Sequence, residues 1–144
     1  NVAVIGKNKE GNPWRVGIQD PTDISDYVGV LSVTDTSVVT SGSYIRYFER
    51  DGNTYHHIID PFTGYPSSSG LLSMTVICES STKADALSTA LFVMGKDKAF
   101  EYWRKKKDFE MIAVTDDMAI YVTEGIARCF TLNDNGRYSL EISD

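Results

Sequence analysis

The two histidines of the chain are adjacent, at His56 and His57. Because neighbouring side chains on a strand point to opposite faces, at most one of them faces a given site. An imidazole ordinarily titrates near neutral pH and can therefore act as a base. His57 leads into Ile58-Ile59-Asp60-Pro61 and the Thr63-Gly64 turn, which would give the backbone beside it a defined shape. We interpret His57 as the candidate base and His56 as a histidine that only hydrogen-bonds a loop.

Asp85 and Thr89 are four residues apart in a segment of helical pattern, so their side chains lie one turn apart on one face. Carboxylate and hydroxyl oxygens suit Mg²⁺ that is also held by substrate phosphates. Taken alone, this spacing favours a plainer interpretation. Asp85 would then interact with the N-terminal end of the helix dipole, and Thr89 would hydrogen-bond a carbonyl one turn earlier.

Thr40-Ser41-Gly42-Ser43 reads as a small-residue turn between two strands. Exposed amides and hydroxyls in such a turn can hold a phosphate, although taken alone a simple turn is favoured. The chain contains no glycine-rich phosphate loop, no Gly-x-Ser-x-Gly motif and no Cys/His zinc pattern. The absence of the familiar nucleophile motifs favours phosphoryl-type chemistry assisted by a metal and a base.

Composition restricts the class of protein. The 144 residues, 42% hydrophobic and 24% charged, suit one globular domain with a core. A formal net charge of −6 argues against a nucleic-acid groove, and we interpret Arg104-Lys105-Lys106-Lys107 as the solvated last turn of a helix. No apolar run approaches the roughly 20 residues that a membrane-spanning helix requires. For Cys78 and Cys129 we favour buried free thiols, with a disulfide left open.

The elements that must position these residues follow from hydrophobic period and turn signals. An Asp51-Gly52 pair predicts a hairpin. A helix over 81–94, capped by Ser81 or Thr82 and ended by Gly95, should be followed by a second helix over about 96–106. The first helix should turn Ala86, Leu87, Ala90, Leu91 and Met94 towards a sheet. We predict strands over residues 2–6, 14–18, 28–33, 37–40, 44–49, 54–59, 71–78, 111–114, 120–123, 126–132 and, at an edge, 138–142. The resulting fold class is α+β, with a mixed or antiparallel sheet packed against a pair of helices.

Four segments, in this order, resemble the ApbE family of FAD:protein FMN transferases, and the similarity runs the whole length of the chain. They comprise the stretch Pro13-Trp14-Arg15-Val16-Gly17-Ile18-Gln19-Asp20-Pro21, a Thr-Ser-Gly segment at 37–44, the signature His57-Ile58-Ile59-Asp60-Pro61-Phe62-Thr63-Gly64-Tyr65-Pro66, and the metal-site helix at Ala84-Asp85-Ala86-Leu87-Ser88-Thr89-Ala90.

The resemblance implies an enzyme that takes FAD, breaks its pyrophosphate, and transfers FMN to a threonine or serine hydroxyl of a partner protein, releasing AMP. It makes His57 the base that activates the acceptor hydroxyl, and Asp85 and Thr89 the ligands of a Mg²⁺ ion that bridges the FAD phosphates. Asp60 would shape the site, and Thr40, Ser41 and Gly42 would line the flavin nucleotide pocket.

Members of the family are about twice as long as this chain. Residues 1–144 are therefore expected to be the C-terminal portion of an ApbE-like domain, with a partial ApbE-like fold. The resemblance also implies a membrane-anchored, extracytoplasmic lipoprotein whose acceptor is a flavoprotein subunit of a membrane redox complex. A homodimer is left open, and nucleic acid is not expected. Two alternatives remain: a Mg²⁺-dependent FAD pyrophosphatase, in which water replaces the protein hydroxyl, and a non-catalytic flavin-binding or structural fragment.

Overall fold

A computed structural model of the chain describes residues 1–44, 47–50, 52–133 and 136–144. Its elements are, in order, β1 (Val2–Val4), β2 (Trp14–Gln19), β3 (Tyr27–Val33), β4 (Thr36–Gly42), β5 (Tyr47–Arg50), β6 (Asn53–His56), β7 (Leu71–Cys78), α1 (Ser81–Met94), α2 (Lys96–Lys106), β8 (Glu110–Thr115), β9 (Ala119–Thr123), α3 (Glu124–Ala127), β10 (Phe130–Leu132) and β11 (Ser139–Ser143).

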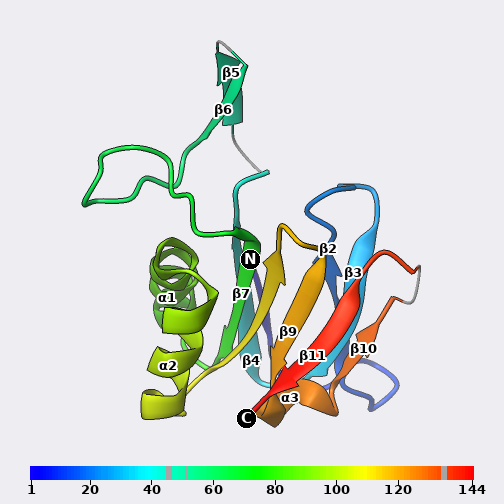
Figure 1. Cartoon of the computed structure of the whole chain (residues 1–144). Coiled ribbons are helices and arrows are strands. Elements are labelled where there is room, and N and C mark those ends of the chain that lie inside the picture. Colours follow the sequence, from blue (N-terminus) through cyan, green and yellow to red (C-terminus); the bar gives the residue numbers. More distant parts are fainter. Residues whose placement is uncertain (45–46, 51, 134–135) are drawn as a thin grey trace.

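The strands form a central sheet of six, in the order β1-β4-β7-β8-β9-β11, and a smaller sheet in the order β10-β3-β2. Pairing is antiparallel except between β9 and the edge strand β11, which run parallel. Helices α1 and α2 cover one face of the central sheet, the smaller sheet lies on the other, and the β5–β6 hairpin projects from the body (Figure 1). The α+β class with a sheet packed against two helices is thereby confirmed.

The central sheet is buried on both faces, so adjacent residues of one strand enter different cores. Val39 of β4 packs in the core beneath the helices, whereas its neighbour Val38 packs in the core against the smaller sheet. In β8, Met111 and Ile112 divide in the same way, and both are fully buried. This alternation follows from the two-residue period of a strand. It decides which polar side chains of β4 can reach α1.

Both predicted helices are present with the predicted bounds, but the first cap and the inward face of α1 differ from expectation. Ser80, rather than Ser81 or Thr82, accepts the hydrogen bond from the Lys83 amide. Gly95 ends α1 with φ +80°, as predicted.

The predicted inward face of α1 is wrong for three alanine and methionine positions. Ala86, Ala90 and Met94 are exposed, and the buried residues are Ala84, Ser88, Leu91 and Phe92. Apolar residues surround most of this helix, so their period does not define one face. The inward face includes Ser88, whose hydroxyl has hydrogen-bond partners inside the fold.

The predicted strand over 126–132 is also only partly correct. Residues of α3 form a short helical turn, and the strand β10 begins at Phe130. The turn carries the chain from β9 in the central sheet to β10 in the smaller sheet, and it still buries Ile126. The apolar pattern is therefore satisfied by a helical turn as well as by a strand.

Thr40 lies in β4, as the strand predicted over 37–40 has it, but Ser41 and Gly42 also belong to β4, so the turn predicted over residues 40–43 is wrong for these two residues. The strand continues because β7 pairs with it as far as Gly42. Both cysteines are free, as favoured, but Cys78 is only half-buried and Cys129 is exposed, so full burial is wrong for both.

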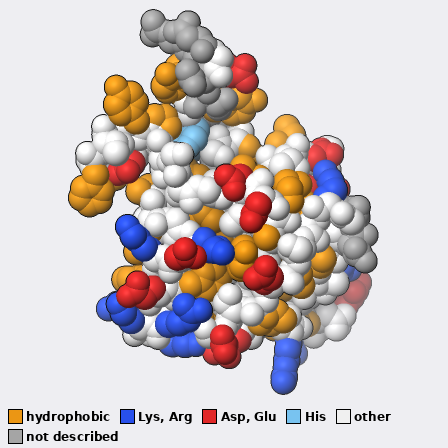
Figure 2. Space-filling view, in the orientation of Figure 1, with side chains coloured by type: hydrophobic (Ala, Val, Ile, Leu, Met, Phe, Trp, Pro, Cys, Tyr) orange, Lys and Arg blue, Asp and Glu red, His pale blue; other side chains and the backbone are white. Residues whose placement is uncertain are grey.

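The β5–β6 hairpin is present, although Asp51 in its turn lies outside the described residues, as do Ile45, Arg46, Asp134 and Asn135. The basic run forms the exposed end of α2, where the Lys107 ammonium lies 2.8 Å from a carboxylate oxygen of Glu124, which confirms the solvated helical turn. Acidic and basic side chains are intermixed over the helices (Figure 2). Within the described part of the chain, no helix is long and apolar enough to cross a membrane.

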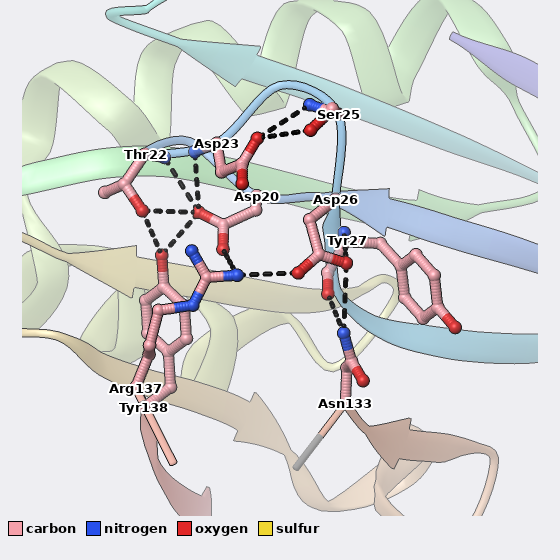
Figure 3. Close-up of polar contacts among 9 residues, drawn as sticks. All are labelled: Asp20, Thr22, Asp23, Ser25, Asp26, Tyr27, Asn133, Arg137 and Tyr138. Carbon is pink, nitrogen blue, oxygen red and sulfur yellow. Dashed lines mark hydrogen bonds and ion pairs between the residues drawn. The ribbon is translucent and has the colours of Figure 1, made fainter. Parts of the chain in front are cut away.

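A polar network joins the loop after β2 to the segment before β11 (Figure 3). The Asp20 carboxylate is fully buried and accepts hydrogen bonds from the Tyr138 hydroxyl at 2.6 Å and from the Thr22 amide and hydroxyl, both at 2.8 Å. The Arg137 guanidinium lies 3.3 Å from its other oxygen and 2.6 Å from Asp26. These donors and this charge hold the last strand against the smaller sheet.

The same contacts shift two pKa values in opposite directions. Burial acts to raise the pKa of Asp20, but the hydrogen bonds from Tyr138 and Thr22 and the charge of Arg137 outweigh it, so this pKa lies below the ordinary value of 3.8. Burial and the hydrogen bond to Asp20 raise the pKa of Tyr138 to about 12. The Asp20 contribution to stability is therefore present above its unfolded pKa and is lost as the pH falls through its folded pKa.

Tyr138→Phe should lower the free energy of unfolding by about 1–3 kcal/mol near neutral pH, because the buried carboxylate loses a donor. The loss should shrink at an acidic pH below the folded pKa of Asp20, which itself lies below 3.8, because the carboxyl group is then protonated in both proteins. Urea unfolding at the two pH values measures this difference. Tyr27→Phe is the matched control, since Tyr27 is exposed, and it should change stability by less than about 0.5 kcal/mol at either pH. An equal loss at both pH values for Tyr138→Phe would contradict the role of its hydroxyl.

Candidate functional site

Three hydroxyl groups meet where β4 packs against α1. Ser41 follows Val39 by two residues and so points to the same, helical side of the sheet. Its Oγ lies 2.9 Å from Ser88 Oγ and 3.0 Å from Thr89 Oγ1. The structure therefore brings the predicted flavin-pocket residue Ser41 into contact with the predicted metal ligand Thr89.

Asp85 lies on α1 one turn before Thr89, and both side chains are exposed. Asp85 Oδ1 accepts a hydrogen bond from Asn1 Nδ2 at 3.2 Å, and the carboxylate borders a pocket of about 390 Å³ that Asn1, Val39 and Ser81 also line. The helix dipole has its main effect within the first turn of a helix. Because α1 begins at Ser81, Asp85 lies beyond that turn, which disfavours the plainer interpretation of Asp85.

The plainer interpretation of Thr89 is met by a long contact, since its hydroxyl lies 3.5 Å from the carbonyl oxygen of Asp85 one turn earlier. The contact of this hydroxyl with Ser41 is shorter, at 3.0 Å, and is therefore the stronger of the two. Thr89 is thus held by a side chain from the sheet, and Asp85 and Thr89 present two oxygen donors on one exposed face of α1.

Thr40 is on the other face of β4 and is separated from this cluster. Its hydroxyl lies 2.8 Å from the Thr75 hydroxyl, within the layer between the two sheets. Gly42 is buried, and a Cβ at this position would lie 2.4 Å from the Tyr44 ring. Burial raises the pKa of Tyr44. Thr40 and Gly42 therefore contact the small-sheet side, whereas Ser41 alone of the three predicted residues faces α1.

His56, at the end of β6, anchors the loop that follows. Its Nε2 lies 3.0 Å from the Ser67 carbonyl oxygen, and its Nδ1 accepts from the Ile58 amide at 3.3 Å, which assigns the proton to Nε2. The ring packs edge-on against Phe92 of α1, with centroids 5.9 Å apart. This agrees with the interpretation of His56 as a histidine that hydrogen-bonds a loop.

His57 is exposed and begins that loop. The turn beside it is held by Asp60, whose Oδ1 accepts from the Phe62 amide at 2.8 Å and whose carbonyl accepts from the Gly64 amide at 2.8 Å. Asp60 N in turn donates to the Tyr65 carbonyl at 2.9 Å, and Gly64 takes a φ of +73° that favours glycine. Asp60 therefore shapes the turn through both its side chain and its backbone, and His57 adjoins a defined structure.

Apart from Thr40 and Gly42, which lie on the other side of β4, the predicted site residues fall into two groups along α1. Asp85, Thr89 and Ser41 are joined through contacts at the middle of the helix, whereas His57 stands in the loop that His56 attaches near Phe92, at the far end. Among the described residues, no three His, Cys, Asp or Glu side chains are placed to hold a metal ion together. Sequence reasoning missed Ser88 and Asn1. The position of Ser88, directly before Thr89, was the one available signal.

The chain matches known proteins over most of its length. The profile of the ApbE family matches residues 1–113. Two curated proteins named FAD:protein FMN transferase, from Treponema pallidum and Klebsiella pneumoniae, are 44% and 39% identical over 114 and 137 residues, which are 78% and 94% of this chain. The matched regions are 32% and 42% of those relatives, so the chain spans less than half of their length.

Solved structures agree with these matches. The crystal structure of the ApbE protein from Thermotoga maritima superposes with a TM-score of 0.79 at 40% identity, covering 88% of this chain and 41% of that one. The flavin transferase ApbE from Vibrio cholerae gives a TM-score of 0.66 at 32% identity, covering 78% of this chain and 35% of that one. By the match to the family profile and by these relatives, the chain belongs to the ApbE family.

Proposed function

We propose that this chain serves an FAD:protein FMN transferase, as the C-terminal portion of a longer enzyme that attaches FMN from FAD to a threonine or serine of a partner protein and releases AMP. The observation that carries the proposal is the exposed Asp85–Thr89 oxygen pair, held by Ser41 in a chain of the ApbE family. Relatives named for this activity support the substrate assignment.

The two α1 side chains fit a Mg²⁺ ion. Both offer oxygen, both are exposed on one face, and they are too few to enclose a metal. Mg²⁺ is commonly bound by one or two protein oxygens together with substrate phosphates and water. Asp85 and Thr89 would hold the ion, and when bound it would offset charge that develops on the pyrophosphate oxygens.

The proposed reaction is a displacement at the phosphorus of the FMN half of FAD. The acceptor hydroxyl forms a new phosphoester bond, the bond between this phosphorus and the bridging oxygen breaks, and AMP leaves with that oxygen. His57 takes the hydroxyl proton at an imidazole nitrogen. Its exposed position at the start of a rigid turn is accessible to a protein substrate, and the Asp60 turn keeps the backbone beside it in one conformation.

The acceptor is proposed to be a flavoprotein subunit of a membrane redox complex, and the enzyme an extracytoplasmic, membrane-anchored lipoprotein. Membership of the ApbE family supports both proposals.

Product analysis tests the transfer reaction directly. The complete protein, incubated with FAD, Mg²⁺ and an acceptor peptide, should yield peptide whose mass has increased by one FMN, together with AMP. Mass spectrometry of the peptide and chromatography of the nucleotides measure both products. Free FMN and AMP with unmodified peptide would instead establish a pyrophosphatase.

His57→Ala should lower the rate of transfer by about 10²–10⁴-fold, the usual contribution of a general base, and leave FAD affinity nearly unchanged. The rate is followed by FMN attachment and the affinity by quenching of flavin fluorescence. Added imidazole should restore part of the lost rate, because it can replace the missing base. Transfer at the wild-type rate in His57→Ala would remove this residue from the mechanism.

Asp85→Asn should raise the Mg²⁺ concentration required for half-maximal transfer by at least about tenfold, because the ion loses its one charged protein ligand. A Mg²⁺ titration of the transfer rate measures this shift. Asp97→Asn is the matched control, since Asp97 is an almost fully exposed aspartate on the neighbouring helix α2, and its titration should match that of the wild type. Equal titrations for Asp85→Asn and the wild type would refute the ligand assignment.

A further inference from the structure

In the hydroxyl cluster between β4 and α1, the direction of each hydrogen bond can be determined, because each hydroxyl has a single proton to donate. Ser88 Oγ lies 3.0 Å from the Asp85 carbonyl oxygen, which can only accept. The Ser88 proton is therefore committed to that carbonyl. Ser88 is fully buried, and among the described residues it has one further partner, Ser41.

The direction of the next two hydrogen bonds follows by counting protons. Because Ser88 has donated its proton, the 2.9 Å contact with Ser41 requires Ser41 to donate. Because Ser41 has then donated its own proton, the 3.0 Å contact with Thr89 requires Thr89 to donate. The reverse order would send the Thr89 proton to the Asp85 carbonyl at 3.5 Å and leave the shorter Ser88 bond unmade.

We infer that Ser88 and Ser41 are positioning residues that turn the Thr89 proton inward, so that the lone pairs of its oxygen face the Asp85 side and are ready to accept a divalent cation. This inference rests on the proposed function, in which Thr89 is a metal ligand. A hydroxyl that pointed its proton outward would repel a cation. Ser41 and the fully buried Ser88 exclude that orientation of the Thr89 hydroxyl before any ion binds.

Two features distinguish this arrangement from ordinary packing. Ser88 is a polar residue on the inward face of α1, where Leu91 and Phe92 are also buried and where a hydroxyl without partners would be costly. The chain of donors also begins at the exposed hydroxyl of Thr89, so the orientation of buried Ser88 is linked to a group on the surface. A second hydroxyl pair, Thr40 of β4 and Thr75 of β7, lies on the opposite face of the central sheet and provides an internal comparison.

Binding of Mn²⁺, used as the probe for Mg²⁺, tests the inference on the chain itself. The electron spin resonance signal of the free ion is titrated with wild-type chain and variants, with and without FAD. Ser88→Ala should weaken Mn²⁺ affinity by about tenfold, the usual loss when a residue behind a metal ligand is removed. Ser41→Ala should weaken it at least as much, and Ser41→Thr, which retains the hydroxyl, should restore it.

We call the series of hydrogen bonds from Thr89 through Ser41 to Ser88 the relay. A double variant distinguishes this relay from two serines that affect Mn²⁺ affinity independently. Ser88→Ala combined with Ser41→Ala should bind Mn²⁺ no more weakly than Ser41→Ala alone, because Ser88 acts only through Ser41. Thr75→Val is the matched control: it removes a buried hydroxyl of similar environment, so it should lower stability in urea yet leave Mn²⁺ affinity unchanged.

The outcomes distinguish failure of the relay from failure of the site. If the wild type binds Mn²⁺ and Ser88→Ala binds it equally well, the relay is refuted and the proposed metal pair stands. If the wild type takes up no Mn²⁺ in either condition, both the relay and the metal pair in the proposed function are refuted. Additive losses in the double variant would also overturn the relay.

Discussion

Burial of the central sheet on both faces is the constraint on which the rest of the structure depends. Strand β4 lies between α1 on one side and the smaller sheet on the other, so its residues must alternate between two cores. Val38 and Val39 satisfy this alternation with apolar side chains, and the pairing of β4 with β7 extends it to Gly42. The same alternation fixes the side to which the polar residues of that stretch point. The Ser41 side chain points towards α1, and the Thr40 side chain points into the space between the two sheets.

Helix α1 receives two attachments from distant parts of the chain. At its middle, Ser41 contacts Ser88 and Thr89 through hydrogen bonds. At its far end, the His56 ring packs on Phe92 and ties the loop of His57 to the body. The base and the oxygen pair of the proposed reaction therefore belong to different segments that share one helix as support. Hydrophobic side chains stand out from the region of the hairpin and loop (Figure 2), and Phe62 of the loop is 95% exposed.

The polar network around Asp20 shows how a charged group is retained inside this fold. A buried carboxylate without partners would be neutralised or expelled, but four hydrogen-bond donors and one guanidinium surround this one. Its partners come from the loop after β2 and from the segment before β11, and Tyr138 is 118 residues from Asp20 in the sequence. The edge strand is thus fixed by polar contacts at one end and by parallel pairing with β9 along its length. This part of the molecule is remote in role from α1, yet it stabilises the sheet that α1 packs on.

By itself, the sequence determined the elements whose signals are local. The bounds of α1 and α2, the strand β7, the β5–β6 hairpin and the Asp60 turn follow from period, glycine and turn chemistry between near neighbours. The spacing of Asp85 and Thr89 likewise placed both on one helical face. Only the tertiary structure decided which face of α1 is buried, because apolar residues surround this helix and Ser88, a polar residue, is among those inside.

Tertiary structure also decided that Ser41 and Gly42 lie in a strand instead of the expected turn, because β7 supplies hydrogen bonds that the local sequence does not predict. As neighbours on a strand, Thr40 and Ser41 then point to opposite faces of the sheet. The partners of Ser41 are 47 and 48 residues away in sequence. Contacts over such separations depend both on the register of the strands and on the rotation of the helix about its axis. The spacing of residues along one sequence predicts neither of these.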